Sequence, residues 1–139
     1  MIVLDTNLLS EVMRPAPSPR VADWLAAQPA SSLFVTTISQ AEILYGVALL
    51  PFGQRREALA RESQAIFEVD FAGKLLPFDQ DAATMYPEIV VQRRIMGRPI
   101  GTLDAQIAAI ARSRGATLVT RNIRDFEGCG IDLFNPWTN

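Results

Sequence analysis

Five short apolar runs alternate in this chain with longer segments of helical periodicity, and this alternation restricts the fold more than any other feature. The runs lie at residues 2–4, 33–36, 74–76, 117–120 and 131–134. Apolar runs of this length are typical of strands that are buried on both faces, as in parallel sheets covered by helices. The pattern therefore predicts an α/β fold with a parallel sheet.

Capping residues mark where the intervening helices begin. Ser18 followed by Pro19 is typical of a helix start, because serine accepts bonds from free amides and proline fits the first turn. Further helix starts are expected at Ser39, Gly53, Asp79 and Thr102, with an interruption or kink at Pro87. Neither a repeat nor a linker interrupts the series, so residues 1–139 are expected to form one domain.

Catalysis by this chain has to rely on carboxylates. Histidine is absent, and Cys129 is the single cysteine. These counts exclude a Ser-His-Asp or Cys-His nucleophile, a zinc site of the His or Cys kind, and a disulfide within the chain. Carboxylate oxygens are hard ligands, which suit Mg²⁺ or Mn²⁺.

The protein is expected to be cytoplasmic, with no part in a membrane. Its longest apolar stretch, residues 43–50, is far shorter than the roughly 20 residues that span a bilayer. The N-terminal sequence MIVLD reaches an acid too soon for a signal peptide. The formal charge of −2 argues against tight, nonspecific binding to duplex DNA, but it allows a nuclease with a local basic face.

The acidic residues occur where a parallel sheet binds its ligands. Asp5 directly follows the first apolar run, and Glu42 lies near the start of the helix after the second. Asn122 and Asp125 come just past the fourth run. Asp104 reaches the same edge if its helix runs antiparallel to that strand, as right-handed crossovers require. Because ligands bind beyond the carboxyl ends of parallel strands, we expect these side chains to converge.

Each of these acids also has a local structural explanation. The sequence SQAE, from Ser39 to Glu42, matches a capping box in which Glu42 bonds to the Ser39 amide. Asp104 could complement the helix dipole, and Asp5 could cap a helix that begins near Asn7. Caps do not require convergence, whereas two carboxylates about 5 Å apart repel by roughly 3 kcal/mol at an effective dielectric of about 20. Convergence would therefore indicate a bound cation or a carboxyl group that stays protonated.

Four motifs, in order, resemble those of PIN-domain proteins. They are MIVLDTN with Asp5, SQAE with Glu42 and a following YG, IGTLD with Asp104 and a following IAAIA, and LVTRN with Asn122 and then DF with Asp125. The ending FNPW also fits, so the match extends from residue 1 to residue 137. The sequence is most similar to VapC-type toxins, including the FitB-like subgroup.

The resemblance implies a PIN-like three-layer fold with a central, mostly parallel, five-stranded sheet flanked by helices, and a single PIN domain over residues 1–139. It implies a Mg²⁺-dependent endoribonuclease, with Mn²⁺ as a substitute, that acts as the toxin of a type II toxin–antitoxin module. It further implies a VapB-like, DNA-binding antitoxin that covers the active site, and a homodimer within a larger complex.

On this interpretation, Asp5 and Asp104 are the direct or near-direct Mg²⁺ ligands. Glu42 completes the acidic cluster, through water or as a base that orients water. Thr6 and Thr120 are candidates for binding the carboxylates or the substrate, although threonine is also ordinary at the end of a strand.

The fourth position of the site stays open between Asn122 and Asp125, because relatives differ in which of the two positions carries an acid. An amide can hold a water but cannot supply charge. We therefore expect Asp125 to supply the fourth negative charge and Asn122 to position it or a water.

Several arginines are candidates for contact with RNA. Arg93, Arg94 and Arg98 precede Asp104, where they could attract phosphates as an electrostatic funnel or form a solvated helix face. Arg121 and Arg124 flank the fourth motif and could also reach phosphates.

Other protein classes place an acid after the first strand but fit less well. An aspartyl-phosphate phosphatase usually needs a second acid where this chain has Asn7, and a receiver domain needs a lysine at the end of a strand, whereas Lys74 begins one. The stronger alternative is a PIN-fold binding module, or a co-repressor partner, without nuclease activity.

Overall fold

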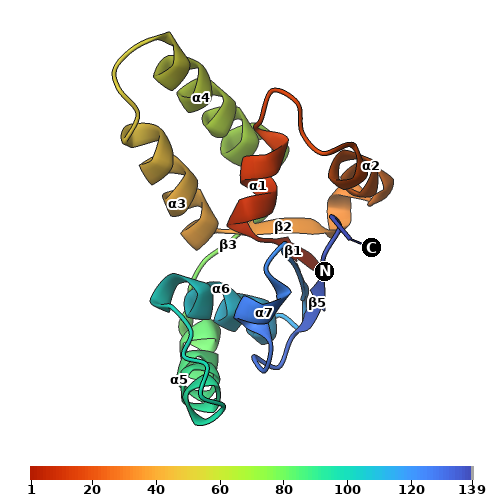
Figure 1. Ribbon diagram of the computed structural model, residues 1–139, viewed down its shortest axis with the longest axis vertical. Helices are drawn as coiled ribbons and strands as arrows, with labels where there is room; N and C mark the ends of the chain where they lie inside the picture. The colour runs from red at the N-terminus through yellow and green to blue at the C-terminus, as the bar shows by residue number, and fades with distance from the viewer. Residues whose placement is uncertain (139) are drawn as a thin grey trace.

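The sheet of this protein is entirely parallel and has the strand order β3-β2-β1-β4-β5. The computed structural model describes residues 1–138 (Figure 1). The strands are β1 (Ile2–Leu4), β2 (Leu33–Thr36), β3 (Leu75–Leu76), β4 (Thr117–Val119) and β5 (Asp132–Phe134). The predicted five-stranded α/β fold is therefore confirmed, with β3, β4 and β5 each one residue shorter than expected.

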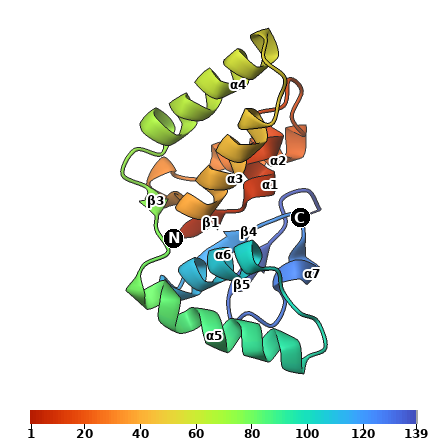
Figure 2. The same cartoon turned by 90° about the vertical axis from the view of Figure 1, so that its left-hand side faces the viewer.

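Helices cover both faces of the sheet (Figures 1 and 2). On one side lie α5 (Gln80–Ile95) and α6 (Thr102–Ser113). On the other side lie α1 (Thr6–Val12), α2 (Pro19–Ala27), α3 (Thr37–Ala48) and α4 (Gln54–Ala65). The shorter elements are η1 (Ala30–Ser32), η2 (Ile66–Asp70) and α7 (Ile123–Phe126). Within residues 1–138, no helix is long and apolar enough to cross a membrane.

Two apolar clusters hold these layers together, one on each face of the sheet. Neighbouring residues of a strand point to opposite faces. Val3 accordingly packs in the cluster of Ile89 and Ile107, from α5 and α6, while Leu4 packs in the cluster of Leu8 from α1. This alternation fixes the register of β1 and thereby the direction in which the chain leaves it at Asp5.

The expected helix starts are confirmed at Ser18 and Asp79 but not at Ser39. Ser18 and Asp79 accept bonds from the amides of Val21 and Ala82. Helix α3 begins earlier than predicted, because Thr36 at the end of β2 is its cap. The interruption expected at Pro87 is not observed, because helix α5 continues through this exposed residue and packs along its length against α6.

Candidate active site

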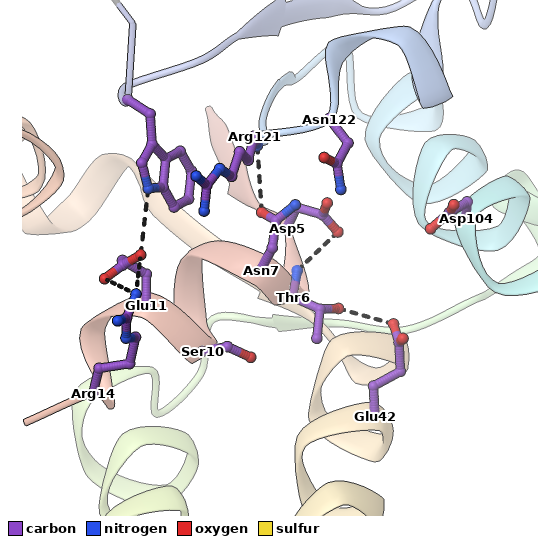
Figure 3. Close-up of a pocket in the computed structure, with 11 residues that line it drawn as sticks. Asp5, Thr6, Asn7, Ser10, Glu11, Arg14, Glu42, Asp104, Arg121 and Asn122 are labelled. Carbon is purple, nitrogen blue, oxygen red and sulfur yellow. Dashed lines mark hydrogen bonds and ion pairs between the residues drawn. The ribbon is translucent and has the colours of Figure 1, made fainter. Parts of the chain in front are cut away.

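A pocket of about 520 Å³ lies at the carboxyl edge of the sheet and is lined by Asp5, Glu42 and Asp104 together. Asp5 follows β1, Glu42 belongs to the helix that follows β2, and Asp104 lies in the first turn of α6. Figure 3 shows the three side chains approaching the same space from different elements. The expected convergence of these acids is therefore observed.

Asp5 is both a helix cap and a member of this pocket. One carboxylate oxygen accepts a bond from the Thr6 amide at 2.8 Å, and the other accepts from the Thr120 hydroxyl at 2.8 Å. Only 5% of the residue is exposed. Burial raises the pKa of Asp5 to about 6; these two hydrogen bonds oppose the rise, and the charges of Asp104 and Glu42 add to it.

Glu42 does not form the capping box that the sequence allowed. The Ser39 amide donates to the Thr36 hydroxyl at 3.0 Å instead. The Thr6 oxygen lies 2.8 Å from both the Ser39 hydroxyl and a Glu42 carboxylate oxygen. Since a hydroxyl has one proton, Thr6 can donate to Glu42 while it accepts from Ser39. The Glu42 carboxylate is thereby turned toward the pocket.

Asp104 lies across the pocket from Asp5 and is half-buried (Figure 3). Burial raises its pKa, as do the negative charges of Asp125 and Glu42, while the positive charge of Arg93 lowers it. A dipole-complementing acid at a helix start needs none of these neighbours. A bound cation, or a carboxyl group that stays protonated, would therefore stabilise this convergence of like charges.

The fourth position is shared between two residues. Asn122 lines the pocket, and its backbone N–H donates to the Thr120 hydroxyl at 3.1 Å. Asp125 is exposed on α7, where its amide donates to the Asn122 carbonyl at 3.0 Å in the expected helical turn. Asn122 is thus nearer to the pocket, and Asp125 acts on Asp104 through its charge.

Thr120 is a buried hub of this site. Its hydroxyl donates to the Asp5 carboxylate. The same hydroxyl accepts from the backbone N–H of Asn122 and, at 3.2 Å, from the side-chain amide of Asn7. The residue is 0% exposed, so it cannot contact a substrate. Its position supports only the first of its expected roles, which is to bind a carboxylate.

Arg93 is wrongly predicted as an RNA contact. It is only 4% exposed, and its guanidinium donates to the backbone carbonyls of Arg98 and Asp125. Arg98 is half-buried and bonds to Glu127 at 2.9 Å. Arg94, by contrast, is exposed. The turn of α5 directs the neighbouring Arg93 and Arg94 to different environments, and Arg98 lies beyond the end of that helix.

The far end of the pocket holds side chains to which the sequence gave no role. Asn7 and Glu11 line it from α1, Arg14 lines it from just beyond the end of that helix, and Trp137 lines it from near the C-terminus. A spacing of four residues puts Asn7 and Glu11 on one face of α1. That spacing is the signal that could have identified them.

The donor set suits a hard divalent cation without enclosing one. Among residues 1–138, no three Asp, Glu, Cys or His side chains lie close enough to hold a metal ion by themselves. Mg²⁺ keeps several of its waters and often binds through one or two carboxylates, so a closed cage is not required. The oxygen-only chemistry of the pocket fits Mg²⁺ or Mn²⁺.

Comparison with known proteins extends this picture. The PIN domain model matches residues 2–128. The VapC ribonuclease Y4jK of Sinorhizobium fredii is 38% identical over 137 residues, which cover 99% of this chain and 98% of the relative. The toxin FitB of Neisseria gonorrhoeae is 38% identical over 138 residues, which cover 99% of each chain. A solved structure of FitAB bound to an IR36 DNA fragment matches with a TM-score of 0.93 and 36% identity, over 99% of this chain and 96% of that one.

The fold and these comparisons together define an α/β nuclease with a cluster of carboxylates at the carboxyl edge of its sheet. The chain belongs to the PIN-domain family, among its VapC- and FitB-type toxin ribonucleases. Nucleases of this family are typically metal-dependent.

Proposed function

We propose that this protein is a Mg²⁺-dependent endoribonuclease, the toxin of a type II toxin–antitoxin module that acts in the cytoplasm. The observation that carries the proposal is the pocket in which Asp5, Glu42 and Asp104 converge, although none of the three forms an ion pair with an arginine or lysine among residues 1–138. Folding such a cluster is unfavourable unless a ligand compensates for the repulsion. The family membership supplies RNA as the substrate.

In this proposal, different residues of the chain have different roles in the reaction. Asp5 and Asp104 would hold Mg²⁺, and Glu42 would complete the acidic cluster through water. When bound, the ion would supply Lewis acidity toward the phosphate and toward the attacking water. Glu42, fixed by Thr6, orients that water for attack on phosphorus. Because the chain has no histidine, the leaving oxygen would be protonated by solvent or stabilised by the metal.

We further propose that a VapB-like, DNA-binding antitoxin covers the site and that the toxin is a homodimer within the complex. A groove of about 910 Å³ supports the antitoxin part, because it adjoins the pocket at Thr6, Ser10 and Glu42. Its lining from α1, α3 and α4 is rich in apolar side chains, such as Ile43 and Leu59, which suit an amphipathic helix. The FitAB structure supports an assembly that also contains DNA.

Residues 1–139 are proposed to be a single PIN domain. The family model reaches residue 128, and β5 beyond it pairs with β4 in the same sheet. This pairing supports the inclusion of β5 in the same domain.

Cleavage of RNA under metal control tests the proposal. Purified protein should cut single-stranded RNA in Mg²⁺ or Mn²⁺, and excess EDTA should stop the reaction. Asp104→Asn protein, purified in parallel, controls for contaminating nuclease. A binding module without nuclease activity would leave RNA intact under every condition, and cleavage that persists in EDTA would contradict the metal mechanism.

A further inference from the structure

The end of the pocket away from Asp104 contains two arginines in different electrostatic states. Arg14 pairs with Glu11 at 3.4 Å, so its charge is balanced. Arg121 has no carboxylate within ion-pair distance among residues 1–138. Figure 3 shows its side chain extending along this end of the pocket. Arg121 is therefore the cation in the pocket lining whose charge is left for a ligand.

Arg121 is held in place by an aromatic ring that is itself fixed. Its guanidinium carbon lies 5.4 Å from the centre of the Trp137 ring, within the range of a cation–π contact. The Trp137 indole donates to Glu11 at 3.3 Å, and Glu11 is buried and also accepts from the Ser18 amide at 3.1 Å. The interaction with Trp137 limits the conformational freedom that Arg121 would otherwise lose on binding.

The backbone of Arg121 is fixed as well. Its amide donates to the Asn7 side chain at 3.4 Å, and its carbonyl accepts from the Asn135 side chain at 3.2 Å. The same Asn135 side chain accepts from the Trp137 amide at 2.9 Å. Arg121 and its aromatic support thus form one unit, joined to the loop that follows β4.

We propose that Arg121, supported by Trp137, binds the RNA phosphate adjacent to the one that is cleaved. This inference rests on the proposed function, which places the scissile phosphate at the carboxylates. A guanidinium group matches the geometry of a phosphate, and its delocalised charge stacks on aromatic rings. The pocket, at about 520 Å³, is of a size that accommodates part of a nucleotide chain as well as an ion.

RNA fits this arrangement better than an acidic protein segment does. The acidic cluster repels an isolated anion, so an anion needs a second point of attachment to stay in the pocket. An RNA strand carries phosphates in succession, so one can reach the metal-bearing carboxylates while its neighbour reaches Arg121. Arg121 is then a substrate-binding residue, and Trp137 and Glu11 are positioning residues.

RNA binding can be measured apart from cleavage in an Asp104→Asn background. Fluorescence anisotropy with a labelled single-stranded RNA in Mg²⁺ would measure the RNA affinity of two double variants. One combines Asp104→Asn with Arg121→Gln, and the other combines Asp104→Asn with Arg124→Gln. Arg124 is an exposed arginine three residues away that does not line the pocket, so it is a matched control for the loss of charge. We expect R121Q to weaken binding about three- to fivefold and to reduce the salt slope by about 0.7. R124Q should change each quantity by less than half as much.

Two further variants separate charge from positioning. R121K should restore the salt slope but not the full affinity, because lysine lacks the planar fork. In a Trp24→Phe background, Trp137 is the single remaining tryptophan. Its fluorescence should change on RNA binding, and R121Q should abolish most of that change.

Steady-state cleavage keeps this inference separate from the proposed function. In an otherwise unchanged protein, R121Q should raise KM by a similar factor while kcat stays near its original value, since a neighbouring phosphate is bound in ground and transition states alike. If R121Q binds and cleaves RNA as R124Q does, the inference about Arg121 is overturned, although the nuclease proposal stands. An effect of R121Q on antitoxin binding would not rescue the inference. If the parent protein cleaves no RNA, the nuclease proposal fails by itself.

Discussion

Asp5 and Glu11 line one pocket, and each is only 5% exposed. Their pKa values are nevertheless shifted in opposite directions. The pKa of Asp5 is raised to about 6, chiefly by burial. The pKa of Glu11 is lowered, chiefly by the hydrogen bond from the Ser18 amide, with Trp137 and Arg14 adding to that effect. Burial alone therefore does not decide the charge state of a carboxylate in this pocket.

The difference lies in the partners of each acid. Asp5 receives two hydrogen bonds but shares the pocket with like charges, whereas Glu11 is surrounded by donors and a cation. The charge of Glu11 is thus balanced by groups of the chain, whereas the cluster of Asp5 is the one for which we propose a metal ligand. The three predictions below test this contrast, from the largest expected effect to the smallest.

Substituting Asp104 by Asn should produce the largest effect, on activity rather than on stability. The side chains are nearly isosteric, but the substitution removes one charge from the proposed metal site. RNA cleavage should fall by about a thousandfold, and growth toxicity should disappear. The free energy of unfolding should change by less than about 1 kcal/mol, as measured by chemical denaturation.

Asp81→Asn is the matched control for Asp104→Asn, because Asp81 is an exposed acid in the first turn of α5. It should leave cleavage at the parent rate. If Asp104→Asn unfolds the protein or leaves toxicity intact, Asp104 does not have the proposed role.

The stability of the metal-free protein should fall as pH rises from about 4 to about 6. Asp5 is protonated more readily in the folded protein than in the unfolded chain, so its contribution is fully present below the unfolded pKa and is lost as pH rises through about 6. The loss attributable to Asp5 is about 3 kcal/mol. Chemical denaturation in EDTA across this pH range measures it, and Asp5→Asn should remove most of it.

Glu11→Gln is the contrasting variant in this experiment. Because the pKa of Glu11 is lowered, its contribution to stability is present above the unfolded pKa of 4.5 and is lost as pH falls. Glu11→Gln should therefore lower Tm by a few degrees at neutral pH. The decline in the free energy of unfolding between pH 4 and pH 6, which Asp5 causes, should persist in this variant. A parent protein whose stability is flat over that range would show that Asp5 is not destabilised by burial.

The smallest effects are expected at the shared fourth position. Asp125→Asn should weaken Mg²⁺ binding by a few fold, about 0.5–1 kcal/mol, because it removes a charge that acts on Asp104 from an exposed position. Asn122→Ala should slow cleavage with little change in Mg²⁺ affinity. Calorimetric titration with Mg²⁺ and single-turnover cleavage measure the two separately. A parent-like result for Asp125→Asn in both assays would leave a three-acid site.

Local patterns in the sequence predicted the parts of this site that follow directly from the strands. The apolar runs indicate where strands end, and a parallel sheet brings those ends to one edge. Asp5 and Glu42 are therefore expected at that edge, and Asp104 joins them because a right-handed crossover runs its helix antiparallel to the following strand. The cap of α3 was misassigned because Thr36 and Ser39 are both good capping residues, and only the position of β2 favours Thr36.

The environment of each charge could not be predicted in the same way. Arg93 and Arg94 are adjacent in the sequence, yet one is buried against backbone carbonyls and the other is exposed. Glu11 and Trp137 are separated by 126 residues, and their hydrogen bond exists only because β5 returns the C-terminus to α1. The sequence by itself determined the sheet and the convergence of its acids, because both follow from local periodicity and from the parallel direction of the strands. Only the tertiary structure decided which charges are compensated, because compensation depends on partners that the folding of distant segments brings within a few ångströms.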